Sequence, residues 1–374
     1  MNSKKVGVIT YHGAYNYGSA LQALATQDVI ESLGYQVDIL NYRMKSQRQY
    51  YSMYRITNGW KKLLSDAAQL PVHKKRMQRQ EKFETFFEKY LNLTTEFSRP
   101  REMEQLKDDY RIVVSGSDQI WNKHSNELEN VDWSFMLPYF LAGMNCVKVS
   151  YASSISNMTD EDLERIKPLL EDFSQIAMRE ESSAKRISDL LEKEITSVID
   201  PTFMHCKEEW IEKFDLKRKR QEPYILLYSL GGRKNSKALV EDAVKFAKAK
   251  KQKLQVVTPF AYYSSSDIVE NHSEYGPVEF LNSIYNAAAI ITDSFHGTAL
   301  ASNFNKNFFS ICAKGGSEFR KTELLKSIGL ETQIVSDIAD IYEIYEKVPD
   351  YRKANERMDA QREKSLKYLK DALQ

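Results

Sequence analysis

The chain is poor in the features that mark several classes of protein. Its three cysteines, Cys146, Cys206 and Cys312, are odd in number and widely spaced, which indicates reduced, packed thiols rather than a disulfide framework or a zinc site. No window approaches the run of about 20 apolar residues that spans a bilayer, and MNSKKVGVITYHG lacks the apolar core of a signal peptide. We therefore expect a cytoplasmic protein without a bound metal.

Charge of one sign is also lacking. The chain has 53 basic and 52 acidic residues among 374, so global charge names no partner. No Gly/Ser-rich or Pro-rich segment and no internal repeat interrupts the sequence. With 42% hydrophobic residues, this is the composition of a soluble globular protein, and the length predicts about two domains at roughly 100–200 residues each.

The first half alternates strand and helix patterns. Residues 5–11 (KVGVITY) and 35–42 (YQVDILNY) are β-rich and flank a helical pattern over 19–34, which makes a βαβ unit. Further strand patterns follow at 111–118, 147–154 and 195–200, with helical patterns over 160–173 and 182–194. The alternation predicts a parallel sheet covered by helices, and so a Rossmann-like N-terminal domain over residues 1–205.

The second half repeats this rhythm. Strand patterns at 224–231, 254–259, 289–294 and 307–313 alternate with helical patterns such as 236–251 and 277–287. The predicted fold is α/β, with two Rossmann-like, doubly wound domains, 1–205 and 222–348, facing a crevice where such sheets bind ligands. Residues 349–374 form a charged helix that we expect to pack back on the first domain.

Residues 41–90 depart from the alternation. They hold twelve basic and four acidic residues and nine aromatic ones. A basic, aromatic insertion of this kind is open to three interpretations: a solvated helical hairpin, a surface for anionic lipid headgroups or a lipid-linked diphosphate, or a nucleic-acid surface. We carry the first two forward and expect no nucleic-acid partner.

Two segments of the first half place polar residues at strand ends. After the first strand, Asn16 and Gly18 lie where the helix begins; they form either an ordinary tight turn or an anion site made of backbone N–H groups. The run VVSGSDQIWN puts Ser117, Asp118 and Gln119 at the end of a buried strand. These side chains suit sugar hydroxyls, with Asp118 alternatively capping the next turn.

Two further residues have alternative roles. Trp121, in the same run, is either core packing or a platform for a sugar ring. Arg179, in SQIAMREESS, follows a short apolar stretch; it is either a surface charge or a planar fork for a carboxylate or phosphate.

The segment AAAIITDSFHGTALASNFN is the most specific. An apolar strand ends in Asp293 and Ser294, and Gly297 and Thr298 then open a helix of small residues. His296 therefore lies at a helix N-terminus, where the dipole and free N–H groups favour anions and an imidazole is suited to proton transfer near neutral pH. A core histidine is the alternative.

These motifs together resemble the polysaccharide pyruvyltransferase family. YHGAYNYGSALQALA, GSDQIWN, AMREESS, IDPTF and TDSFHGTALASNF occur in that family's order, over about residues 6–330. The resemblance implies a GT-B-like architecture and transfer of a carboxyethylidene (pyruvyl ketal) group from phosphoenolpyruvate to a sugar of a surface glycan such as a capsule or exopolysaccharide.

The resemblance also assigns roles. It makes His296 a general acid or base that touches the donor, and Arg179 the opening of an Arg-acidic-x-x-Ser pattern that holds the donor's phosphate or carboxylate. Many members have an arginine two residues before the histidine, where this chain has Ser294. Arg320 or Arg233 would then supply the missing cation. We place the donor with Ser294, Gly297, Thr298, Asn16 and Gly18 and the acceptor with Ser117, Gln119 and Trp121, and assign proton transfer to His296, Asp118 or Asp293.

The expected partners are phosphoenolpyruvate, as a co-substrate with no further cofactor, and a sugar acceptor that is lipid-linked or polymeric. Residues 41–90 would then bring the enzyme to the inner face of the membrane. One alternative is a nucleotide-sugar glycosyltransferase of the same architecture, since fold alone does not decide function. The other is a non-catalytic member that kept the fold and lost the reaction.

Overall fold

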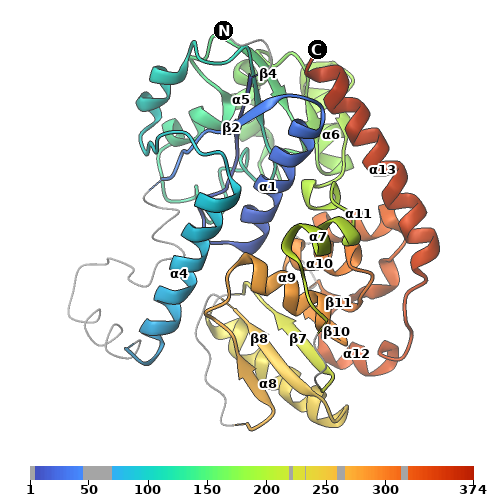
Figure 1. The fold of residues 1–374 in the computed structure, drawn as a ribbon. Coiled ribbons are helices and arrows are strands. Elements are labelled where there is room, and N and C mark those ends of the chain that lie inside the picture. Colours follow the sequence, from blue (N-terminus) through green and yellow to red (C-terminus); the bar gives the residue numbers. More distant parts are fainter. Residues whose placement is uncertain (1–4, 45–69, 219–221, 232, 259–265, 313–318) are drawn as a thin grey trace. The chain divides into compact units, whose positions relative to one another are not determined.

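The structure is a computed structural model and describes residues 5–44, 70–218, 222–231, 233–258, 266–312 and 319–374. The described residues divide into two compact units (Figure 1). Unit 1 comprises residues 5–44, 84–204 and 359–374, and unit 2 comprises residues 70–83 and 205–358. Most of the basic insertion, residues 45–69, lies outside the described residues.

Unit 1 is built on short parallel strands with helices between them. Its strands are β1 (Lys5–Ile9), β2 (Gln36–Ile39), β3 (Ile112–Ser115), β4 (Val147–Ser150), β5 (Ala177–Met178) and β6 (Thr196–Ser197). Its helices are α1 (Tyr17–Ser32), α5 (Asp160–Leu170) and α6 (Glu181–Leu191), and its 3₁₀ segments are η1 (Pro100–Leu106), η2 (Trp133–Phe140) and η3 (Pro201–Phe203).

The main sheet of unit 1 has the order β2-β1-β3-β4, and every pairing in it is parallel. The chain leaves β1 toward β2 on one side and returns to β3 on the other, so the strand order reverses between β1 and β3. Ligands of open α/β sheets bind at such a switch point, beyond the carboxyl ends of the strands. In unit 1 that position is occupied by the residues after Ile9 and Ser115.

Unit 2 holds the second parallel sheet. Its strands are β7 (Tyr224–Tyr228), β8 (Lys253–Val257), β9 (Val269–Asn271), β10 (Ala289–Thr292), β11 (Asn307–Ile311) and β12 (Ile334–Val335). Its helices are α7 (Lys207–Phe214), α8 (Arg233–Ala249), α9 (Pro277–Asn286), α10 (Phe295–Asn303), α11 (Phe319–Ile328) and α12 (Ile338–Ile344), with the 3₁₀ segment η4 (Glu331–Gln333).

The sheet of unit 2 has the order β9-β8-β7-β10-β11-β12. This is the 3-2-1-4-5-6 order of a doubly wound Rossmann sheet, with its switch point between β7 and β10. Both central strands are fully buried, because they are covered on both faces. The prediction of two parallel α/β, Rossmann-like halves is confirmed, whereas the shared crevice stays a prediction.

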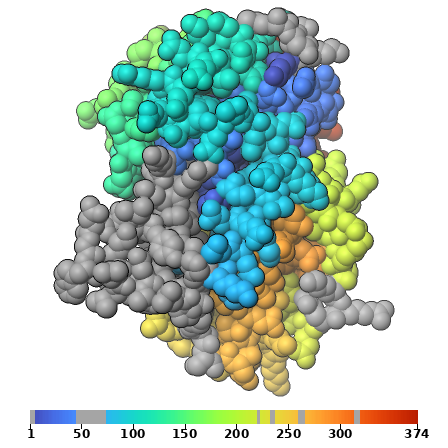
Figure 2. All heavy atoms as spheres, turned by 60° about the vertical axis from the view of Figure 1, so that its left-hand side comes forward, coloured from blue at the N-terminus to red at the C-terminus, as the bar shows by residue number. Residues whose placement is uncertain are grey.

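Helix α4 (Leu70–Tyr90) contributes to both units. In unit 2, Lys82 pairs with Glu279 at 2.7 Å. In unit 1, Phe86 and Phe87 are buried, so these aromatics of the insertion belong to the core rather than to a membrane-facing surface. The remaining face of α4 is exposed (light blue in Figure 2).

Helix α13 (Tyr351–Ala372) ends in unit 1. The Tyr368 hydroxyl donates to the main-chain oxygen of Ser150 at 2.7 Å, and the Ser365 hydroxyl accepts from the backbone N–H of Ile199 at 3.0 Å. The chain end is therefore tied to β4 and to the segment before η3.

Two further expectations concern composition. Cys146, Cys206 and Cys312 are half-buried, so they are packed less deeply than expected. Among the described helices, none has the length and apolarity to cross a membrane.

Candidate functional site

His296 lies at the switch point of unit 2. It is the second residue of α10, which begins directly beyond the carboxyl end of β10, and its side chain is in edge-to-face contact with Phe295 at 5.3 Å between ring centroids. The Ser294 hydroxyl caps the helix by accepting from the backbone N–H of Gly297 at 3.3 Å. The N–H groups of the first turn are those that a helix does not bond internally, and the dipole adds positive potential there.

Gly297 lets this helix approach the sheet closely. A Cβ at this position would lie 2.3 Å from the Thr292 Oγ1 and 2.7 Å from a ring carbon of Tyr228. Thr298 is fully buried, and its hydroxyl donates to the main-chain oxygen of Ser294 at 3.0 Å and contacts the Ser310 hydroxyl at 2.8 Å. The Thr298 side chain therefore packs inside unit 2, and the assignment of Thr298 to the donor stays a prediction. The close packing leaves no room for a side chain at position 297.

Two cations lie near the same strand ends. The Arg320 guanidinium lies 5.9 Å from the centroid of the Phe295 ring. Lys321 is only 3% exposed, and its ammonium group donates to the main-chain oxygens of Asp293 at 2.8 Å and of Ile311. Two cations, Arg320 and Lys321, thus lie near the start of α10, together with the carboxylate of Asp293.

Asp293 organises the neighbouring loop. Its carboxylate accepts from the Ser229 hydroxyl at 2.6 Å and from the backbone N–H groups of Leu230 at 2.8 Å and Gly231 at 3.2 Å. These bonds hold the segment after β7 against the end of β10. Both carboxylate oxygens are therefore engaged in hydrogen bonds within this loop, and proton transfer by Asp293 stays a prediction.

The corresponding edge of unit 1 is acidic. Arg179 follows β5 and is buried among three carboxylates: its guanidinium contacts Glu180 at 3.0 Å, Asp200 at 3.1 Å and Asp118 at 3.6 Å. Although burial alone would lower it, these carboxylates raise the pKa of Arg179. The three carboxylates already compensate the charge of Arg179. Its role in holding the donor stays a prediction.

Asp118 connects this cluster to α1. Its carboxylate accepts from the Ser19 hydroxyl at 3.2 Å and from the backbone N–H of Gln119 at 2.8 Å, so it also caps the following turn. Asn16 is the N-cap of α1, and its side chain accepts from the N–H groups of Gly18 and Ser19. The N–H of Gly18 is therefore used by the cap, and the contact of Asn16 and Gly18 with the donor stays a prediction.

Two predicted acceptor residues are internal. The Trp121 side chain is 0% exposed; its indole N–H donates to the main-chain oxygen of Tyr139 at 3.0 Å and its ring stacks on Phe140. Ser117 is also 0% exposed and donates to the main-chain oxygen of Ala152 at 2.9 Å. These contacts agree with the core-packing interpretation of Trp121, and the assignment of both residues to the acceptor stays a prediction. Gln119 is half-buried beside Asp118.

The order of these motifs in the sequence is that of a known family. The profile described as polysaccharide pyruvyl transferase matches residues 16–311. This chain belongs to the polysaccharide pyruvyl transferase family. The matched range contains the candidate residues of both units except Arg320 and Lys321. The search of curated proteins found no sequence that matches this chain.

Solved structures with the same fold are distant in sequence. A putative UDP-N-acetylglucosamine 2-epimerase from Listeria monocytogenes has a TM-score of 0.53 at 9% identity, covering 96% of this chain and 91% of its own. The UDP-GlcNAc 2-epimerase of Methanocaldococcus jannaschii, solved with UDP-GlcNAc and UDP, has a TM-score of 0.53 at 13% identity, covering 95% and 98%. The chain therefore has the GT-B-like fold of these epimerases.

Sequence patterns missed two features of this chain. In the sequence, Lys321 is one charged residue of an amphipathic helix. Only the structure shows that its ammonium group is buried at the ends of two strands. Arg43 forms a bidentate pair with Glu84, at 2.9 and 2.6 Å, and lies 2.6 Å from the position of a Cβ on Gly13. The glycine at position 13 was the feature of the sequence that could have indicated this close approach. The contact with Arg43 holds the loop between β1 and α1.

Proposed function

We propose that this pyruvyl transferase takes its pyruvyl group from phosphoenolpyruvate and forms a carboxyethylidene ketal on a hexose of a surface polysaccharide or its lipid-linked precursor. The observation that carries the proposal is the positively charged strand edge of unit 2, where His296 opens α10 beside Arg320 and Lys321. A compact molecule that bears a phosphate and a carboxylate is complementary to these cations and to the N–H groups at the start of α10.

Each group has a role with the donor. The first-turn N–H groups of α10 and the Arg320 guanidinium bind the phosphate and carboxylate oxygens, since both are charge-assisted donors. The ammonium group of Lys321 adds positive potential near the start of α10. It is held there by main-chain oxygens at the ends of β10 and β11. Together they replace the arginine that the family pattern has at Ser294.

His296 supplies the proton transfers. As imidazolium it protonates the methylene carbon of phosphoenolpyruvate while a sugar hydroxyl bonds to the enol carbon and releases its proton. The C–O bond to phosphate then breaks, inorganic phosphate leaves with a proton, and the second hydroxyl closes the ketal. Two hydroxyl protons are thus released, one balanced by the new methyl group and one by phosphate.

The acidic edge of unit 1 suits the acceptor. A phosphate is repelled by the cluster of Asp118, Glu180 and Asp200, in which Arg179 is the one cation bonded to all three, whereas a hydroxyl can donate to Asp118. Gln119, beside it, offers an amide for a second hydroxyl. We assign Asp118 to orienting the hydroxyl that attacks, with Arg179 as its positioning residue.

We place the reaction in the cytoplasm, where phosphoenolpyruvate and lipid-linked sugars meet at the inner face of the membrane. The basic residues of the 41–90 insertion would favour that surface. The step belongs to capsule or exopolysaccharide assembly.

The test is calorimetric titration of the full chain with phosphoenolpyruvate and, in parallel, with UDP-N-acetylglucosamine. Binding of phosphoenolpyruvate and its weakening in Arg320→Met support the proposal. The matched control is Lys326→Met, which removes an exposed cation from the same helix and should leave affinity unchanged. Binding of the nucleotide sugar alone would instead indicate glycosyl transfer, and binding of neither would contradict donor recognition at this edge.

A further inference from the structure

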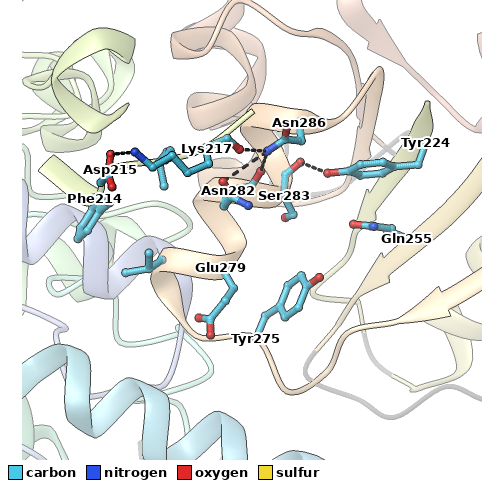
Figure 3. Close-up of a pocket in the computed structure, with 12 residues that line it drawn as sticks. Phe214, Asp215, Lys217, Tyr224, Gln255, Tyr275, Glu279, Asn282, Ser283 and Asn286 are labelled. Atoms are coloured by element: carbon cyan, nitrogen blue, oxygen red, sulfur yellow. Dashed lines mark hydrogen bonds and ion pairs between the residues drawn. The ribbon is translucent and has the colours of Figure 1, made fainter. Parts of the chain in front are cut away.

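Unit 2 contains a cavity that the proposed reaction does not use. It has a volume of about 330 Å³ and lies between the end of α7, strands β7 and β8, and helix α9 (Figure 3). Tyr224, at its wall, is the first residue of β7, whereas His296 lies beyond the opposite, carboxyl end of the same sheet. The cavity is therefore a separate place from the strand edge that binds the donor. Its volume is within the range of small-molecule sites, about 300–1,000 Å³.

The wall combines aromatic rings with amide groups. Tyr275 points from the loop before α9 toward Gln255 on β8, and Asn282 lies on α9 between them and the end of α7 (Figure 3). The Tyr224 ring is fixed, because its hydroxyl donates to the main-chain oxygen of Ser283 at 2.7 Å. Aromatic faces pack against the C–H surfaces of sugar rings, and amides both donate to and accept from hydroxyls.

The amides retain hydrogen-bonding capacity. Gln255 is buried and donates to the Glu270 carboxylate at 3.2 Å, and within the described residues its amide oxygen accepts no hydrogen bond. Asn282 accepts from Asn286 through its main-chain oxygen at 2.9 Å, and its own amide nitrogen donates to none of the groups described. One acceptor and one donor thus face the cavity from different elements.

The charged groups at the wall are already paired. Glu279 contacts Lys82 at 2.7 Å and accepts from the backbone N–H of Gly276 at 3.1 Å. Lys217 is paired with Asp215. A free anion or cation would have to displace one of these partners, whereas a neutral molecule with several hydroxyls would not.

We propose that this cavity binds a neutral hexose unit of the polysaccharide acceptor, away from the residue that is pyruvylated. The inference rests on the proposed function in taking a glycan as the acceptor. A second attachment point would raise the effective concentration of the glycan at the enzyme. It would therefore lower the KM for a long acceptor without altering the chemical step.

The experiment measures sugar binding without turnover. Saturation-transfer NMR on the full chain uses neutral probes: the methyl glycosides of glucose, galactose, mannose and N-acetylglucosamine, and the disaccharides lactose and cellobiose, at millimolar concentration. We expect at least one probe to bind. Asn282→Trp, which fills the cavity, should abolish that binding, and Gln255→Leu should weaken it by about tenfold, as loss of hydrogen bonds to a ligand does.

Two controls separate this proposal from the proposed function. Asn282→Trp should keep the affinity of the wild type for phosphoenolpyruvate, which also shows that unit 2 is folded. His296→Gln should keep the sugar binding. Absence of binding by all six probes, or binding to Asn282→Trp as strong as to the wild type, overturns the cavity proposal and leaves donor recognition intact. If the wild type binds a sugar probe but does not bind phosphoenolpyruvate, the result contradicts the proposed function alone.

Discussion

The ammonium group of Lys321 donates to the main-chain oxygen of Asp293 at 2.8 Å, one residue before the cap of α10. A cation is thereby buried directly behind the helix N-terminus that carries His296. Burying an ammonium group costs free energy unless its N–H groups form hydrogen bonds. Here they donate to main-chain oxygens at the ends of two strands. Lys321 therefore places a fixed positive charge near Ser294, the position at which the family pattern has an arginine.

Lys321→Met should raise the dissociation constant for phosphoenolpyruvate at least tenfold, because positive potential near the phosphate is lost. Lys321→Arg should recover part of the affinity. Calorimetric titration of both variants measures the effect, and thermal unfolding without ligand reports the cost to the fold separately. An unchanged dissociation constant in a folded Lys321→Met protein would exclude an electrostatic role.

His296→Gln should lower kcat for phosphate release by about 10²–10⁴-fold, the range for loss of a general acid or base. Glutamine keeps a polar side chain at the start of α10, so affinity for phosphoenolpyruvate should change much less than kcat. Phosphate release with a glycan acceptor measures kcat, and calorimetry measures affinity. Equal losses in both would make the imidazole a binding group rather than a proton carrier.

Gly297→Ala should destabilise unit 2 by about 1–3 kcal/mol, as overpacking does. The added Cβ meets the Thr292 hydroxyl at 2.3 Å and a Tyr228 ring carbon at 2.7 Å, so α10 must move away from the sheet. Urea unfolding measures the free energy, and binding of phosphoenolpyruvate should weaken with it. Wild-type stability for this variant would show that the helix accommodates a methyl group.

Arg179→Met should destabilise the protein by about 3–5 kcal/mol, because three carboxylates lose their buried cationic partner. The matched control is Arg186→Met, which breaks an exposed pair with Asp160 and should cost less than about 1 kcal/mol. Denaturant unfolding of both variants provides the comparison. Similar costs for the two would contradict the account of the cluster around Arg179.

His12 should make the fold sensitive to acid. Burial, partly offset by the hydrogen bond with Asn41, lowers the pKa of His12 to about 4, whereas an unfolded histidine has a pKa of about 6.5. The unfolded chain therefore binds the proton first as the pH falls, and stability is lost between about pH 6.5 and pH 4. The wild type should lose about 2–3 kcal/mol more than His12→Asn between pH 7 and pH 4 in urea unfolding, and parallel losses would assign the acid sensitivity to other groups.

Periodicity and strand-end position predicted much of this molecule. The apolar runs over 5–11 and 289–294 became the central strands β1 and β10, and the polar residues after them lie at the switch points, because parallel strands bring their carboxyl ends to one edge. His296 was found in this way. These features depend on local pattern and on a general rule of topology.

Side-chain direction could not be predicted in the same way. Trp121 and Asp118 are three residues apart, yet the indole is in the core and the carboxylate faces Ser19, since the turn between them decides which side chain is buried. Lys321 has no special sequence context, and its hydrogen bonds to the main-chain oxygens of Asp293 and Ile311 depend on how α11 packs against the ends of β10 and β11. Contacts of this kind follow from tertiary packing, which composition and spacing do not encode.

The discontinuity of unit 1 has a consequence for biosynthesis. Residues 359–374, which tie β4 and the segment before η3 through Tyr368 and Ser365, follow the whole of residues 205–358 in the chain. The ribosome therefore exposes nearly all of unit 2 before unit 1 has its last helix. A nascent chain arrested before residue 359 would therefore contain nearly all of unit 2, whereas unit 1 would lack the contacts of Tyr368 with Ser150 and of Ser365 with Ile199.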